Sequence, residues 1–469
     1  MTSDAQHGDD HQAPRPPAPV IGGLPEEASP RRTVRSWILW DLGSNAFNTT
    51  ILSFVYTVYL VDQVAATPAE GQLVYSRAQL IAGILVALLA PLMGAWADRV
   101  ANRRRLLTLT SLLAVVCMAA MYFVPPEPNY LILGVTLVAV CSLITEIAGV
   151  FYHGMLHQIS TAKTVGRISG IGWASGYVGG MLTLVIAVVF VQFGGQLGLP
   201  TDNLENVRMV GFICAGWMLL FSLPIMFWGP TTVRSEALER KPLRLLGTYR
   251  DIGRTIAGLW RSDRPRLHFL IAAAIYRDGL SAVFAFAGVI ASASYGMDQT
   301  QIIMFAIGAN IAAALGAFLL GGLDDRFGPK PVIVGALAAI IVFGAIIVGY
   351  TVTMVEVEEP PIPLTWVFVM CGLGLSSFVG AAQSASRTLL TRMTPAKDIN
   401  EMFGLYATVG RGVSFISPAL IAAFTSLGIA VYGTESRGQF LGMLGIVLTL
   451  VLGLLAFLPL KARDTPPAP

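Results

Sequence analysis

Long apolar stretches dominate this chain of 469 residues, and they follow one another with short polar breaks. A helix needs about 20 apolar residues to cross the hydrocarbon core of a bilayer, and the stretches are long enough. Only 13% of the residues are charged, against about 25% in a typical soluble domain. The sequence therefore predicts an all-α polytopic membrane protein with twelve transmembrane helices. The predicted spans lie near residues 37–61, 78–98, 105–124, 130–157, 168–193, 207–228, 267–294, 300–323, 330–352, 364–387, 402–427 and 438–460.

The predicted spans form two sets of six, which a polar segment separates. We therefore expect two six-helix bundles, residues 34–229 and 267–462, joined by a cytoplasmic linker at 230–266. Apolar residues recur at helical spacing in the linker, with arginines between them, which predicts an amphipathic helix on the membrane surface. Residues 1–33 lack an apolar run and are predicted to be a disordered cytoplasmic tail, and residues 463–469 a second cytoplasmic tail.

Lysine and arginine are distributed unequally between alternate loops. Cytoplasmic loops of membrane proteins carry an excess of these residues, and here the loops on the side of the N-terminus carry most of them. Arg387 and Arg392 are among the cations assigned to these loops, whereas the opposite loops contain only Arg77, Arg208 and Arg437. This asymmetry predicts that both termini are cytoplasmic. The short loops, with no visible organelle-targeting segment, favour the inner membrane of a bacterium.

One short motif occurs twice, each time where the second span of a predicted bundle ends. It reads Gly, three residues, Asp-Arg, one residue, Gly or Ala, one residue, and Arg or Lys. Two copies in register indicate an internal repeat. Their aspartates can face the positive N-terminus of a neighbouring helix, which would make the motif a gate. The alternative is a cytoplasmic loop whose cations only reflect membrane topology. The predicted gating residues are Gly94, Asp98, Arg99, Arg103, Gly321, Asp325, Arg326 and Lys330.

The repeated motif resembles the one that follows the second and eighth helices in the major facilitator superfamily of transporters. Ala101 stands where that family usually has glycine, and Asn102 where it has a basic residue. The resemblance implies two bundles that rock about a central site, with the motif residues closing the cytoplasmic side. It also implies that the first and fourth helices of each bundle line the central cavity.

Polar residues inside the predicted spans are costly in a bilayer and are therefore candidates for function. Asp41 and Asn45 lie in the first span of the first bundle, and Arg277 and Asp278 in the first span of the second. An aromatic residue comes shortly before the acid in both places. Together with the resemblance, this pattern predicts that these residues lie near the substrate path.

The fourth span carries Glu146, His153 and His157, roughly on one helical face. A carboxylate followed by imidazoles is typical of a proton path, because histidine titrates near neutral pH. The alternative is a structural role, in which Glu146 pairs with Arg277 and the histidines cap the span. Two histidines at this spacing can bind a metal, but further ligands are lacking, so no metal site is predicted.

A single arginine, Arg411, lies about two turns into the eleventh span. An arginine at that depth needs a partner or a water-filled cavity. It can bind an anionic group of the substrate, or it can pair with Glu401 or Asp98. We favour the structural or gating role over substrate binding.

Small residues recur at four-residue spacing in the fifth and eighth spans. Such stripes let two helices approach closely. In the superfamily that the motif resembles, these two helices meet across the two bundles, so the stripes are predicted to form the moving interface. The predicted interface glycines are Gly172, Gly176, Gly180, Gly308 and Gly316.

A longer match in the last third of the chain includes Gln383 and Arg387, followed by a Glu-x-Phe-Gly-x-Tyr segment that begins at Glu401. It resembles the vacuole-effluxer-like branch of the superfamily, which is named after a fungal vacuolar amino-acid exporter linked to autophagy. His153 stands where relatives often have asparagine, and Arg411 where they often have lysine. These departures bear on the substrate more than on the fold.

These patterns together predict a secondary transporter that works by alternating access and exports a small polar solute, such as an amino acid, in exchange for protons. Export of drugs or of lipid-linked envelope precursors is the alternative, and a non-transporting receptor or scaffold is a third. The predicted substrate and proton pathway comprises Asp41, Asn45, Glu146, His153, Arg277, Asp278, Gln383 and Arg411.

The sequence also argues against several other functions. It has no nucleotide-binding loop and no convincing nucleophile–base pair, so we predict no enzyme activity and no cofactor. Its cations lie on loops between apolar runs, which is not a nucleic-acid signature. The expected partners are a small-molecule substrate, a proton or other coupling ion and the lipid bilayer, and the chain is predicted to be a monomer.

Overall fold

The computed structural model describes residues 24–460 apart from 26, 101, 197, 199, 202, 231–244 and 434–438. These residues form long helices joined by short loops, and no β-strand occurs among them. Most of the predicted tails, at 1–23 and 463–469, lies outside the described residues, as does the linker before residue 245.

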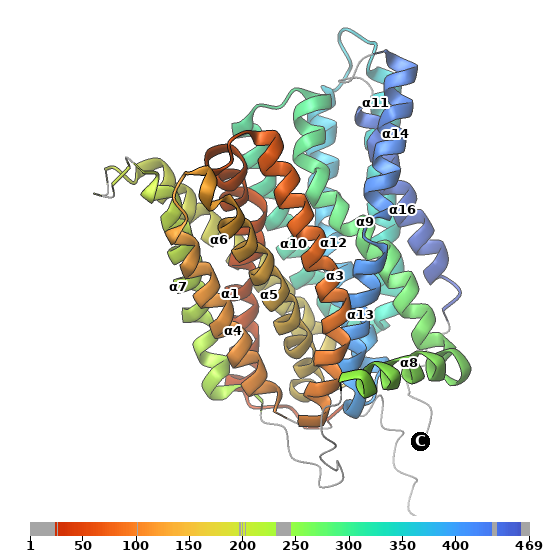
Figure 1. Cartoon of the computed structure of the whole chain (residues 1–469). Helices are drawn as coiled ribbons and strands as arrows, with labels where there is room; N and C mark the ends of the chain where they lie inside the picture. Colours follow the sequence, from red (N-terminus) through yellow and green to blue (C-terminus); the bar gives the residue numbers. More distant parts are fainter. Residues whose placement is uncertain are drawn as a thin grey trace, which may run out of the picture.

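The helices run side by side through the length of the molecule (Figure 1). Those of the first half of the chain are α1 (Arg31–Ala46), α3 (Pro68–Val100), α4 (Arg103–Ala120), α5 (Leu131–Ile159), α6 (Val165–Phe193) and α7 (Glu205–Trp228). Those of the second half are α9 (Arg264–Tyr295), α10 (Gln299–Phe327), α11 (Pro329–Met354), α12 (Leu364–Met393), α13 (Ile399–Val413), α14 (Ile416–Tyr432) and α16 (Gly442–Phe457).

Eleven described segments are long and apolar enough to cross a bilayer, against the twelve spans predicted. The remaining prediction, 37–61, falls on α1, a π-helical segment at Phe47–Phe54 and the short α2 (Tyr56–Tyr59). The arginines, Asp41 and Asn45 lower the mean hydropathy of α1. This helix nevertheless packs against α6 and α7, so it belongs to the bundle.

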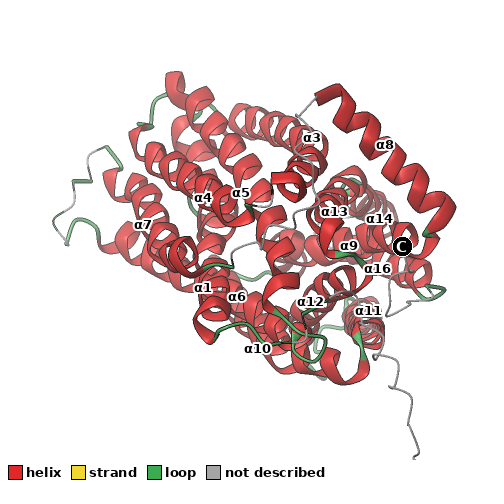
Figure 2. Ribbon diagram, turned by 90° about the horizontal axis from the view of Figure 1, so that it is seen from below, coloured by secondary structure: helices red, strands yellow, loops and turns green. Residues whose placement is uncertain are grey.

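The helices α4, α9 and α11 begin, and α12 ends, at the end of the bundle drawn at the bottom of Figure 1. We call it the basic end, because the terminal turns of these helices contain Arg103, Arg266, Lys330 and Arg392. The linker helix α8 (Leu245–Ser262) lies across this end, where the sequence predicts an amphipathic helix, and contacts α3 and α9. Figure 2 shows it along the rim of the molecule. Leu259 packs inward, whereas the Trp260 side chain points away from the protein.

The predicted eleventh span, 402–427, is interrupted in the structure. α13 ends at Val413 and α14 begins at Ile416. Pro418 explains the interruption, because a proline has no backbone N–H and its ring clashes with the carbonyl four residues earlier, here Ser414. The second half of this span therefore starts with its own helix N-terminus inside the bundle.

The tenth span extends beyond its predicted end at residue 387, since α12 continues to Met393. Arg387 and Arg392, which the sequence assigned to a cytoplasmic loop, therefore lie inside a helix, and both are buried. The assignment was wrong because the rule treats arginine as a loop marker, whereas acidic partners from other helices compensate these two charges.

Four of the five predicted interface glycines pack within their own halves, which corrects the prediction that both stripes form the interface between the halves. A Cβ on Gly172 would lie 2.8 Å from Trp37 of its own half and 2.9 Å from Arg387 of the other half, so this position does reach the interface. Cβ atoms at Gly176 and Gly180 would meet Asn45 and Thr49 of the first span. Cβ atoms at Gly308 and Gly316 would meet Leu373 and Ser377 of α12. Periodicity identifies the face of a helix but not which neighbour covers it, so the sequence could not separate these alternatives.

α6 and α10 do meet across the halves, but at other glycines. A Cβ on Gly170 would lie 2.5 Å from the Ala317 carbonyl oxygen and 2.8 Å from the Gly321 Cα. The corresponding crossing of α3 and α13 uses Gly94 and Gly404, since a Cβ on Gly404 would lie 2.5 Å from the Ala90 carbonyl oxygen. Both crossings bring the two halves into backbone contact near the basic end.

Candidate functional site

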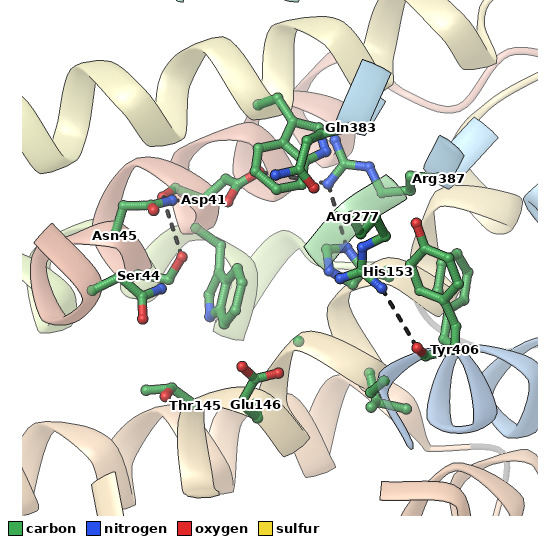
Figure 3. Close-up of a pocket in the computed structure, with 17 residues that line it drawn as sticks. Asp41, Ser44, Asn45, Thr145, Glu146, His153, Arg277, Gln383, Arg387 and Tyr406 are labelled. Atoms are coloured by element: carbon green, nitrogen blue, oxygen red, sulfur yellow. Dashed lines mark hydrogen bonds and ion pairs between the residues drawn. The ribbon is translucent and has the colours of Figure 1, made fainter. Parts of the chain in front are cut away.

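Two adjoining cavities lie between the two halves of the chain. The first, of about 220 Å³, is lined by residues of α1, α5, α6, α9, α12 and α13 (Figure 3). The second, of about 300 Å³, lies against α5, α9, α13 and α14 and shares Glu146 and Arg277 with the first. Every residue of the predicted pathway lines one of them: Asp41, Asn45, Glu146, His153, Arg277 and Gln383 line the first cavity, and Asp278 and Arg411 line the second.

Arg387 is the principal residue that the sequence reasoning missed in this site. Its guanidinium lies between the halves, 3.6 Å from the Asp41 carboxylate, and is 2% exposed. It donates to the Ser169 hydroxyl at 3.0 Å and to the Ser169 carbonyl at 2.6 Å. It also stacks against Trp37, 4.9 Å from the ring centre. A signal was present, because Arg387 follows the predicted Gln383 by one helical turn and so shares its face.

Asp41 is held in place by residues of its own half. The Tyr152 hydroxyl donates to its carboxylate at 3.0 Å, and the Asn45 amide approaches the same group at 3.4 Å. The Tyr152 ring stacks between Trp37 and Trp40, at centroid distances of 4.4 and 4.3 Å. Removing one partner of such a buried ion pair leaves an uncompensated charge. The buried pair of Asp41 with Arg387 therefore joins the two halves beside this stack of aromatic rings.

A second ion pair between the halves joins Glu146 on α5 to Arg411 on α13. Their side chains are 40% and 41% exposed, so this pair faces open space, unlike that of Asp41. The sequence had suggested Arg277 as the partner of Glu146, and Glu401 or Asp98 as the partner of Arg411. The structure corrects both suggestions, because helical periodicity says nothing about which side chains meet across two bundles.

Arg277 has a different environment. Its guanidinium lies over the Tyr406 ring, 4.0 Å from the centroid, and one nitrogen approaches the Tyr406 carbonyl at 3.5 Å. Among the described residues it forms no ion pair. The adjacent Asp278 accepts a hydrogen bond from the Ser417 backbone N–H at 2.7 Å. That contact satisfies one of the free N–H groups at the start of α14.

The histidines of the fourth span have separate positions. The His153 ring lies in the first cavity, with Nδ1 3.4 Å from an Arg387 nitrogen and its ring 5.5 Å from that of Phe403. His157 is buried nearer the basic end and is not among the residues that line the two cavities. The structure thus places only His153 beside the charged residues of the cavity.

At the basic end, the aspartate of the first motif lies against the N-terminus of a helix from the other half. The Asp98 carboxylate accepts hydrogen bonds from the Glu401 backbone N–H at 2.8 Å and the Asn400 side-chain amide at 2.7 Å. Arg103 pairs with Asp98 at 2.8 Å and donates to the Ala396 carbonyl at 3.1 Å. We call this arrangement, with the Gly94 and Gly404 crossing, the α3–α13 contact.

The second motif makes a related arrangement, which we call the α10–α6 contact. Asp325 accepts hydrogen bonds from the backbone N–H groups of Gly166 at 2.7 Å and Arg167 at 2.8 Å, at the start of α6. Its cation is Arg392 of α12, at 3.4 Å, rather than Lys330 of the motif. Both aspartates therefore face a positive helix N-terminus.

Two further motif cations, Lys330 and Arg326, contact other parts of the protein. Lys330 donates to the carbonyls of Leu458 and Leu460 after α16. Arg326 lies over the ring of the adjacent Phe327, 5.2 Å from its centre. The Arg99 side chain lies outside the described residues, so its predicted gating role stays a prediction.

A family model and several known proteins match most of this chain. The family described as "Vacuole effluxer Atg22 like" matches residues 69–164 and 156–463. The "Uncharacterized MFS-type transporter YxiO" of Bacillus subtilis is 24% identical over 436 residues, which cover 90% of this chain and 94% of that protein.

The "Autophagy-related protein 22-1" of Neosartorya fischeri is 24% identical over 306 residues, which cover 63% of this chain and 47% of that protein. The matched region thus spans about half the length of this fungal relative. Among solved structures, the human organic anion transporter MFSD10 superposes with a TM-score of 0.66 at 14% identity, covering 92% of this chain and 100% of that one. At this identity the likeness concerns the fold alone.

Proposed function

Since the chain belongs to the Atg22-like vacuole effluxer family of the major facilitator superfamily, it is a membrane transporter, and we propose that it exports a small polar solute, such as an amino acid, in exchange for protons. The observation that carries this proposal is the pair of cavities between the halves, which are lined by acids of both halves and by arginines of the second half. Intramembrane charges that face a cavity typically mark a substrate or ion path.

We propose that transport proceeds by alternating access, with the two halves moving about these cavities. In this reading the basic end is cytoplasmic, as the loop cations suggest. The α3–α13 and α10–α6 contacts hold it closed in this conformation, because each sets a carboxylate on a helix N-terminus across the halves. Opening toward the cytoplasm then requires both contacts to separate.

We propose Glu146 as the residue that carries the coupled proton. Its carboxylate is accessible from the cavity and pairs with Arg411 of the other half. A proton on Glu146 removes the charge that holds Arg411, so protonation and the link between the halves are coupled at one site. Asp41 is less suited to this role, since Tyr152 and Arg387 already engage its carboxylate and its side chain is only 11% exposed.

The remaining aspects of the proposal concern location and assembly. Placing the basic end in the cytoplasm puts both termini on the cytoplasmic side, in the inner membrane of a bacterium. Each half contributes to the cavities of one chain, so we propose that the monomer is the transporting unit.

The test is uptake of a labelled amino-acid mixture into proteoliposomes, with and without an imposed pH gradient. We expect gradient-driven flux for the wild type and its loss in Glu146→Gln, which keeps the shape of the side chain but not its charge. Glu127→Gln, an exposed acid in the loop before α5, is the matched control. If gradient-driven flux survives in Glu146→Gln, Glu146 is not the residue that carries the coupled proton. A wild type that moves no amino acid directs the search to drugs or lipid-linked precursors.

A further inference from the structure

The three arginines around the cavities differ in how their charges are compensated. Arg387 pairs with Asp41, and Arg411 pairs with Glu146. Arg277 lines both cavities, yet no carboxylate lies within ion-pair distance of it in the part of the chain that the structure describes. An uncompensated charge at bilayer depth is costly, so Arg277 is a candidate for a functional role.

The carboxyl group nearest in sequence is already engaged elsewhere. Asp278 follows Arg277 directly, and successive residues of a helix point about 100° apart. Its carboxylate accepts the Ser417 N–H at the start of α14 and is 9% exposed as a whole residue. Asp278 therefore serves the broken eleventh span, and Arg277 keeps a free positive charge toward the cavity.

The geometry of Arg277 leaves its binding edge available. Tyr406 covers the face of the guanidinium, at 4.0 Å from the ring centre, and a face contact does not use the N–H groups. Those groups lie in the guanidinium plane, and among the residues that the structure describes only one nitrogen has a protein acceptor, at 3.5 Å. A planar fork of free N–H groups matches the two oxygens of a carboxylate.

We infer that Arg277 binds the carboxylate of the transported solute, so that the substrate class is compact carboxylate-bearing molecules, amino acids among them. This inference rests on the proposed transport function and adds the group that the site recognises. Figure 3 shows Arg277 and Tyr406 together at the cavity, with Gln383 and Glu146 also facing it. Cavities of about 220 and 300 Å³ lie at or below the small end of the usual range for ligand pockets, which suits a solute of amino-acid size.

The test measures binding to the purified full-length protein in detergent, by the ligand-induced shift in thermal denaturation and by calorimetry. The probes are the proteinogenic L-amino acids, the primary carboxamide of each one that binds, and the simple carboxylates acetate, succinate and benzoate. We expect carboxamides to bind the wild type about ten- to a hundredfold more weakly than the acids, the range for a lost charge-assisted hydrogen bond.

Variants assign this preference to one residue. In Arg277→Gln the acid should bind as weakly as its carboxamide, and Arg277→Lys should keep part of the preference because it keeps the charge. Arg208→Gln is the matched control, since Arg208 also lies over a tyrosine, Tyr122, but away from the cavities. It should leave the acid-to-amide ratio unchanged.

The outcomes distinguish a failure of the amino-acid proposal from a failure of the role of Arg277. Binding of simple carboxylates without amino acids refutes the amino-acid proposal and supports the role of Arg277. Amino acids that bind as well as their carboxamides overturn the role of Arg277 and leave amino-acid transport standing. Retention of the preference in Arg277→Gln, or no binding of any carboxylate, also overturns it.

Discussion

The α3–α13 and α10–α6 contacts come from two copies of one motif, and their differences show which part of the motif is structurally shared. In both, an aspartate accepts backbone N–H groups at the start of a helix of the other half, close to a glycine crossing. The cation differs. Arg103 pairs back with Asp98, whereas Lys330, at the same motif position, points to the end of α16.

The two contacts also differ in what surrounds the acid. Arg392 stands in for the motif cation beside Asp325 and lies 3.9 Å from the neighbouring Asp324, which is 1% exposed. At the corresponding place in the first motif, Ala97 precedes Asp98. The acid on a helix N-terminus is thus the common element, and each copy has recruited its own cation.

Asp98→Ala should have the largest effect of the changes that test this comparison. It leaves Arg103, 5% exposed, without its carboxylate, and breaking a buried ion pair costs about 3–5 kcal/mol. We expect a lower free energy of unfolding, measured by denaturation in detergent, and a strongly reduced transport rate in proteoliposomes. The exposed acid at the other end of the bundle, Asp62→Ala, is the control, and equal effects of the two changes would refute a special role for the α3–α13 contact.

Asp325→Ala should have a smaller effect. We expect it to lower the free energy of unfolding by about 1.5–3 kcal/mol, because its charge-assisted hydrogen bonds are lost. The effect is smaller because Arg392 retains Asp324 as a partner. The same denaturation and transport measurements apply. An effect as large as that of Asp98→Ala would show that the two contacts are equivalent after all. If Asp324→Ala in the same background adds a further loss, that residue is confirmed as the remaining partner.

Gly404→Ala and Gly170→Ala test the feature that the two contacts share. In each variant a Cβ would lie 2.5 Å from a carbonyl oxygen of the opposite half, and overpacking of this kind costs about 1–3 kcal/mol. Both should destabilise the packing of the two halves at the basic end by similar amounts and change the transport rate. Gly322→Ala, where no atom lies within 4 Å of the added Cβ, should behave as the wild type. Unequal effects of the first two would separate the crossings.

Lys330→Met should have the smallest effect and lower the free energy of unfolding by no more than about 1 kcal/mol. It removes hydrogen bonds at the end of α16 but leaves Asp325 paired with Arg392. Arg103→Met is the informative counterpart, since it strips Asp98 of its cation and should cost several times more. Comparing transport rates and denaturation midpoints of these two variants tests directly whether the motif cation acts in only one copy. A Lys330→Met defect as large as that of Arg103→Met contradicts this.

Much of this architecture could be predicted from the sequence, because bilayer thickness fixes the length of an apolar run and the motif repeats in register. The candidate pathway residues were identifiable for a related reason. A charge inside a span is conspicuous, and its cost limits it to a cavity or a partner. Asp41, Glu146 and Arg277 were found in this way.

The partners of these charges could not be predicted. Helical spacing assigns a residue to a face but does not say which helix covers that face. For this reason Glu146 was matched with Arg277, and Gly176 was assigned to the wrong neighbour. Arg387 was placed in a loop for another reason, because arginine was taken as a loop marker. The interruption after Val413 was visible only as Pro418, and a proline can either bend or end a helix.

The interruption between α13 and α14 has a mechanical consequence. α13 is fastened to α3 of the opposite half, whereas α14 packs against α16 and α9 of its own half. An unbroken helix with these attachments would have to tilt as one rigid rod and drag both neighbours with it. A joint at Ser414 and Phe415 divides the rod. The torsion angles of these two residues can absorb a displacement of α13, which carries Arg411, without a matching displacement of α14.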